Sequence, residues 1–180
     1  GLSQEEVMER LRTTTMYSKI ANLDFNQSAE LLTATVNSMG VSIERAADVF
    51  TYLGDATATG ADEIGIGFSK TGGAAAALGL EFEKVASWIA VISSKTRESA
   101  SSIGHNINTM LSRLSRITET GFNEDDDTKL NDVAKALNSI DIALTDSQGN
   151  FRNFGTILDE VNAKWYKLDD QTRAYIANTM

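Results

Sequence analysis

The chain has 180 residues, of which 42% are hydrophobic and 23% charged; this composition is typical of a globular protein, and the length suits one domain with room for a minor lobe. The net charge of −9 argues against binding along a nucleic-acid backbone, and the absence of cysteine excludes disulfides and thiolate metal sites. No apolar run approaches the roughly 20 residues that cross a bilayer, so we expect no membrane segment.

The first two predicted elements are helices with recognisable ends. Ser3 and Glu6 have the spacing of a capping box, which predicts a helix over the first segment. A second helix is predicted to begin at Asn26 or Ser28, and Gly40 is expected to end it.

The helical period continues through the middle of the chain. Ser42 is expected to cap a third helix that ends near Gly54, and Thr59 to cap a fourth. Two further helices follow the same period. The residues predicted for the buried face of the fourth helix are Ile64, Phe68, Thr71, Ala75 and Leu78. Those of the fifth are Phe82, Val85, Ala86, Ile89 and Ile92, and those of the sixth are Ile103, Ile107, Met110, Leu111, Leu114 and Ile117.

The hydrophobic pattern of the sequence changes after the sixth predicted helix. The acidic stretch "TGFNEDDDTKLND" has no period and predicts a surface loop, followed by a short helix from Leu130 to Ile140. Alternation in "DIALTDSQGNFRNF" and its turn residues predict a small β-hairpin near residues 142–152, and two helices end the chain. With no proline to interrupt helices, we predict an all-α fold of about eight helices with this one hairpin.

The stretch "GIGFSKTGGAAAALG", from Gly65 to Gly79, contains the residue types of several catalytic motifs. A phosphate-binding loop requires its glycines before the lysine, whereas here Lys70 and Thr71 precede Gly72. The triplet from Lys70 to Gly72 matches a penicillin-binding motif, but its partners S-x-x-K and S-D-N are missing. We therefore interpret the stretch as a helix whose small residues allow close packing against neighbouring helices.

Other candidates for chemistry are equally weak. His105 is the only histidine and, without cysteine, cannot supply a typical zinc site. The run Glu124–Asp127 lacks the glycine and glutamate spacing of an EF-hand, which favours a solvated loop. The sequence accordingly predicts no catalytic, cofactor-binding or metal-binding residues, and no enzyme.

The segment "GHNINTMLSRL" resembles the core region of bacteriophage tail tape-measure proteins, where a helix reads approximately a-G-t-a-L-r-t-m-l-s-r-L. His105 and Asn106 depart from the small residues usual in that family. Upstream, "GFSKTGGAAAALGLEFEKVASWIAVISS" looks like the family's small-residue helix, and "IALTDSQGNFRNFGTILDEV" is similar to the hairpin and helix downstream. The structural-motif residues that we single out are Gly72, Ala75, Gly104, Ile107, Met110, Leu111, Arg113, Leu114, Asp146 and Gly149.

The resemblance covers residues 40–180, which we expect to be the tape-measure core-like domain, whereas residues 1–39 form less distinctive N-terminal helices. It implies a phage or prophage virion protein that takes part in tail assembly and sets tail length. The expected partners are tail-tube, initiator or baseplate proteins and assembly chaperones, with self-association also open. The expected location is the virion tail, and the host cytoplasm during assembly. Because the chain lacks an initiator methionine, we expect a fragment of a larger protein.

Two alternatives to this reading stay open. The first is a hydrolase with a carboxylate pair, which would need two acids about 5–10 Å apart in a cleft. The second is a helical module that binds a host partner, which an exposed apolar patch would favour. The residues predicted for the core are Phe50, Ile64, Phe68, Phe82, Trp88, Ile89, Ile107, Met110 and Leu114.

Overall fold

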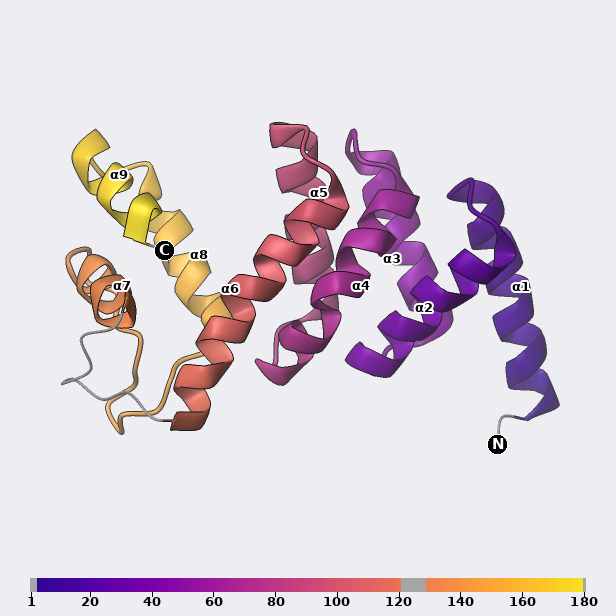
Figure 1. Cartoon of the computed structure of the whole chain (residues 1–180), viewed down its shortest axis with the longest axis horizontal. Coiled ribbons are helices and arrows are strands. Elements are labelled where there is room, and N and C mark those ends of the chain that lie inside the picture. Colours follow the sequence, from indigo (N-terminus) through magenta and orange to yellow (C-terminus); the bar gives the residue numbers. More distant parts are fainter. Residues whose placement is uncertain (1–2, 121–128, 180) are drawn as a thin grey trace. The chain divides into compact units, whose positions relative to one another are not determined.

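Nine α-helices make up the part of the chain that the computed structural model describes, residues 3–120 and 129–179, with side chains described for 3–112 and 132–178 (Figure 1). The all-α class is confirmed, and the described helices number nine rather than about eight. They are α1 (Gln4–Ile20), α2 (Phe25–Met39), α3 (Ile43–Ala56), α4 (Ala61–Ala77), α5 (Phe82–Thr96), α6 (Ala100–Thr120), α7 (Lys129–Asn138), α8 (Phe154–Trp165) and α9 (Asp170–Thr179).

The last two helices are separate because the chain has a new helix start between them. Asp169 accepts a hydrogen bond of 2.9 Å from the backbone N–H of Thr172, the bond that an N-cap side chain provides. None of the helices that the structure describes combines the length and the apolarity needed to cross a membrane.

Side-chain caps start several helices, in part as predicted. Ser3 and Glu6 form the full capping box of α1, with the Ser3 N–H donating to Glu6 over 2.7 Å. The predicted start of α2 at Asn26 or Ser28 is wrong, because the Asp24 carboxylate accepts from the Gln27 N–H and caps a helix that begins at Phe25. Thr59 does not cap α4 either; its hydroxyl donates to the Ala90 carbonyl of α5 instead.

The chain forms two compact units, Gly1–Arg113 and Leu114–Met180. In the first, each helix from α1 to α4 packs against its successor, and α1 with α3, α2 with α4 and α3 with α5 also pack together. The helices therefore follow one another in two staggered rows, as in stacked helical pairs (Figure 1).

An aromatic cluster lies at the centre of the first unit. Phe50 of α3 contacts the rings of Tyr17, Phe68 and Phe82, with ring centroids 5.5–6.2 Å apart. Phe68 and Phe82 meet edge to face at 4.9 Å, an arrangement that aromatic pairs favour. Burial confirms the core prediction for Phe50, Ile64, Phe68, Phe82, Ile89 and Ile107, whereas Trp88 and Met110 are half-buried and the side chain of Leu114 lies outside the described ones.

The predicted β-hairpin near residues 142–152 is wrong. One isolated antiparallel bridge joins Thr145 and Phe151, and the described residues contain no strand. The alternation that suggested a strand is real, since Ile142 and Leu144 are buried and Ala143 between them is exposed. These two side chains, however, join a core of helical residues from α7, α8 and α9, so the segment packs on helices instead of pairing with a strand.

This second core belongs to the second unit alone. Its buried members are Ala134, Ala136, Leu137, Ile140, Ile142, Leu144, Ile157, Val161 and Ile176. The boundary expected at residues 39 and 40 rests on the family resemblance and stays a prediction.

Candidate functional site

The stretch that resembled a phosphate loop is the continuous helix α4, which ends at Ala77 before a left-handed turn at Gly79. Lys70 lies exposed on that helix, and the backbone amides around it form helical hydrogen bonds, so no loop surrounds a ligand. The predicted motif residues Gly72 and Ala75 are both buried.

The small residues of α4 face several neighbours rather than one. A Cβ added to Gly65 would lie 2.7 Å from the Tyr17 hydroxyl of α1, and one added to Gly72 would lie 2.8 Å from the Ser38 hydroxyl of α2. A Cβ on Gly67 would lie 2.9 Å from the Ile89 side chain of α5 and would overlap the Ala100 carbonyl of α6. Gly73, in contrast, has nothing within 4 Å of such an atom.

Helix α6, which contains the segment "GHNINTMLSRL", approaches α4 closely at Gly67. A Cβ on Gly104 would overlap the carbonyl oxygen of Gly67 and lie 2.7 Å from its carbonyl carbon. Of the other predicted motif residues, Ile107 and Leu111 are buried on the same helix and Met110 is half-buried. The side chains of Arg113 and Leu114 lie outside the described ones.

Asp146 and Gly149 form a turn in the second unit. The Asp146 carboxylate accepts hydrogen bonds of 2.9 Å from the backbone N–H groups of Asn150 and Gln148, which hold its pKa below its usual range. Gly149 has a φ of +85°, a conformation that glycine adopts without strain. Both residues thus shape the segment between α7 and α8.

Arg152 ties that segment to α8. Its guanidinium donates to the Ala143 carbonyl over 2.9 Å and forms an ion pair with Glu160. The hydrogen bonds from Arg152 lower the pKa of the Glu160 carboxyl. The pair is partly exposed, so it orients the segment more than it stabilises the fold.

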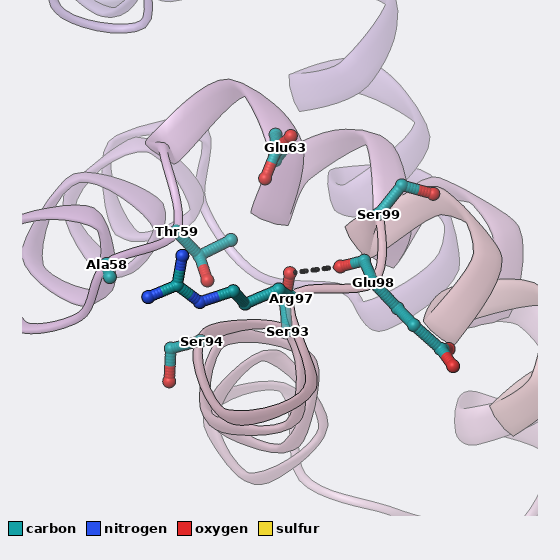
Figure 2. Close-up of a pocket in the computed structure, with 8 residues that line it drawn as sticks. All are labelled: Ala58, Thr59, Glu63, Ser93, Ser94, Arg97, Glu98 and Ser99. Atoms are coloured by element: carbon teal, nitrogen blue, oxygen red, sulfur yellow. Dashed lines mark hydrogen bonds between the residues drawn. The ribbon is translucent and has the colours of Figure 1, made fainter.

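A polar pocket of about 470 Å³ lies where α5 turns into α6, as Figure 2 shows. Its lining residues are Ala58, Thr59, Glu63, Ser93, Ser94, Arg97, Glu98 and Ser99. The Ser93 and Ser94 hydroxyls donate to the Glu98 and Val91 carbonyls, and Ser99 accepts from the Ser102 N–H. The Ser93 bond therefore spans the turn between α5 and α6, the Ser99 bond lies at the start of α6, and the Ser94 bond lies within α5.

The two carboxylates of this pocket, those of Glu63 and Glu98, point in different directions. In Figure 2 the side chain of Glu98 points away from Glu63, toward the outside of the pocket. Arg97, which ends α5 in a left-handed conformation with a φ of +61°, is the cation of the pocket.

A second, larger depression lies between α1 and α3, and we call it the α1–α3 groove. It encloses about 600 Å³ and is lined by Glu9, Arg12, Thr13, Met16, Tyr17 and Ile20 of α1 and by Glu44, Ala47, Asp48, Thr51, Tyr52 and Asp55 of α3. Tyr17 forms part of its floor, where burial, with a smaller effect of the Asp62 charge, raises the pKa of the phenol. Sequence periodicity missed this groove because it depends on how two separate helices pack.

No metal site accompanies these features in the part of the chain that the structure describes: no three histidine or carboxylate groups there are arranged to hold an ion. His105 is exposed on α6. The acidic run Glu124–Asp127, considered for calcium, lies outside the described residues.

Comparison with known proteins gives one family and no structural relative. A family model described as phage-related minor tail protein matches residues 1–180. No solved structure matches the chain.

Proposed function

The chain belongs to the family of phage-related minor tail proteins, and on that premise we propose that it is a folded module of a tail tape-measure protein. As a family member it is a phage tail protein, whose role involves other tail components. The tape-measure proposal adds that the parent chain takes part in tail assembly and in determining tail length. Its partners would be tail-tube, initiator or baseplate proteins and assembly chaperones.

The observation that carries this proposal is the family match over the whole chain, and the packing of the helices refines it. A ruler needs a long uninterrupted element, whereas α6, with 21 residues, spans only about 32 Å at 1.5 Å per residue. Helices α1, α3, α4 and α5 instead share an aromatic core, and α2 packs against α1, α3 and α4. We therefore assign the module to attachment within the tail, and not to measuring its length.

We further propose that the module acts by binding and not by catalysis. The support is the diverging pair Glu63 and Glu98 and the use of the Ser93 hydroxyl in the turn between α5 and α6 (Figure 2). A zymogram on bacterial cell walls with the wild-type chain and a Glu63→Gln, Glu98→Gln variant tests this. Lytic activity of the wild type that the double variant lacks would favour the hydrolase alternative instead.

The attachment role is tested by separating fold from chain length in the phage gene. Deletion of residues 1–180 shortens the parent chain, whereas Gly104→Leu disrupts the contact with Gly67 and leaves the length unchanged. We expect both changes to abort assembly or to leave tails that do not mature, because a docking surface is lost.

A matched control is a deletion of equal length from a long helical region of the parent, which should shorten tails by about 1.5 Å per residue. Electron microscopy of particles from all three variants provides the readout. Intact, infectious tails from the 1–180 deletion, shortened in proportion to the residues removed, would show that the module is part of the ruler.

A further inference from the structure

The α1–α3 groove has an apolar surface that nothing in the described chain covers. Met16 and Ile20 of α1 are 54% and 55% exposed, and Tyr52 of α3 is 71% exposed. Large apolar side chains scattered singly on a surface are ordinary, but these three line one concave depression. A concave apolar surface between two helices has the shape that receives a third helix.

The rim of the groove is strongly acidic. Glu9, Glu44, Asp48 and Asp55 face it, and Arg12 is the single cation among its lining residues. Thr13 bridges the two helices by donating to the Glu44 carboxylate over 3.2 Å. The groove therefore combines exposed apolar side chains with a formal excess of three negative charges.

From this combination we propose that the α1–α3 groove binds an amphipathic helix of a partner protein that carries lysine or arginine beside its apolar stripe. Asp48 and Asp55 are two helical turns apart, about 10.5 Å along α3. Basic residues with the same two-turn spacing on a docked helix would face both carboxylates, while apolar residues between them contact Met16, Ile20 and Tyr52.

Charge distinguishes this occupant from the others. A second copy of the chain would bring its own acidic rim against this one, and like charges across an interface disfavour the pairing. Nucleic acid and anionic lipid surfaces are repelled for the same reason. The proposal does not depend on the tape-measure assignment, since it rests only on the groove.

Two synthetic peptides of about 18 residues, roughly five helical turns, test the proposal by fluorescence anisotropy with the full 180-residue chain. Both carry leucine at i, i+3, i+4 and i+7 spacing; one has lysine at the flanking positions and the other has glutamate there. We expect saturable binding of the basic peptide alone, which weakens as salt screens the charges. No saturable binding of the basic peptide, or equal binding of the acidic one, would overturn the proposal.

Paired variants assign the binding to the groove. The double variant Asp48→Lys, Asp55→Lys is expected to lower the affinity for the basic peptide by at least about tenfold. Glu98→Lys, on the exposed turn before α6, should change that affinity little. Ile20→Ser should weaken binding, and Val91→Ser, at an exposed position of α5, should not. Groove variants that bind like the wild type would contradict the assignment.

Sedimentation velocity decides between a partner helix and a second copy. We expect the wild-type chain alone to show no concentration-dependent dimer of the kind that the Tyr52→Ser substitution would abolish. Such a dimer would identify a second copy as the occupant and overturn the proposal. All substituted positions are exposed, and circular dichroism checks that each variant retains its helices.

Discussion

Gly104 of α6 and Gly67 of α4 are in direct backbone contact, because the hydrogen that Gly104 carries in place of a Cβ points at the carbonyl oxygen of Gly67. The contact is reciprocal, since the corresponding position on Gly67 points at the Ala100 carbonyl of α6. Cα–H···O contacts of this kind recur where helices cross closely. The crossing explains why a helix tolerates glycines that disfavour helix formation.

We predict that Gly104→Ala and Gly67→Ala each lower the free energy of unfolding, by about 1–3 kcal/mol, because the added methyl overpacks the crossing. Thermal or urea denaturation measures the change. Gly73→Ala is the matched control on α4: with nothing within 4 Å, it should stabilise the chain by up to about 1 kcal/mol through helix propensity. Stabilisation by all three substitutions would contradict the close crossing.

We predict that Thr71→Val stabilises the chain by about 1 kcal/mol. The Thr71 hydroxyl is buried and has no hydrogen-bond partner in the part of the chain that the structure describes, so its removal relieves a desolvation cost. Thr59→Val is the control, because the buried Thr59 hydroxyl donates to the Ala90 carbonyl over 3.1 Å. Urea denaturation should show that this second variant is less stable than the wild type, by about 1–2 kcal/mol.

We predict that stability falls above pH 10 in a way that depends on Tyr17. Burial raises the pKa of this phenol, so the folded chain retains a proton that the unfolded chain releases near pH 10. The contribution is complete below that pH and is lost as the pH rises, with a slope of up to about 1.4 kcal/mol per pH unit.

The Tyr17→Phe variant isolates this effect. It loses the hydrogen bond of 2.8 Å to the Ala61 carbonyl, so it should be about 1 kcal/mol less stable than the wild type at pH 7. Above pH 10 the difference should shrink, because the variant has no phenol to ionise. Urea denaturation at pH 7 and at several values between 9.5 and about 11 measures it; a difference that stays constant would show that Tyr17 does not titrate as described.

We predict that ATP and GTP with Mg²⁺ do not raise the melting temperature. Lys70 lies exposed within α4, and the glycines around it are helical, so no cradle of free amides can hold phosphates. Thermal-shift titration tests this, with Lys70→Ala as the comparison. A dose-dependent increase in melting temperature that the variant loses would show that this stretch does bind phosphate.

The helices and their approximate order were predictable from the sequence, because the signals are local. The capping box of Ser3 and Glu6, the left-handed glycine at Gly40 and the apolar positions Ile64 and Phe68 depend on residues within a few turns. Local signals also misled, both at the caps expected for α2 and α4 and at residues 142–152. Alternating burial at Ile142 and Leu144 looks the same whether the extended segment meets a strand or a helical core.

The sequence alone predicts that this chain is helical, that a capping box starts the first helix and Gly40 ends the second, and that Phe50, Phe68 and Phe82 lie in the core. Hydrophobic period and caps specify these features locally. The packed fold, in contrast, shows which helix each glycine of α4 contacts, that residues 142–152 form no hairpin, and that Met16, Ile20 and Tyr52 line one acidic groove. Each of these features arises from contacts between separate segments of the chain, so its geometry follows from how whole helices pack.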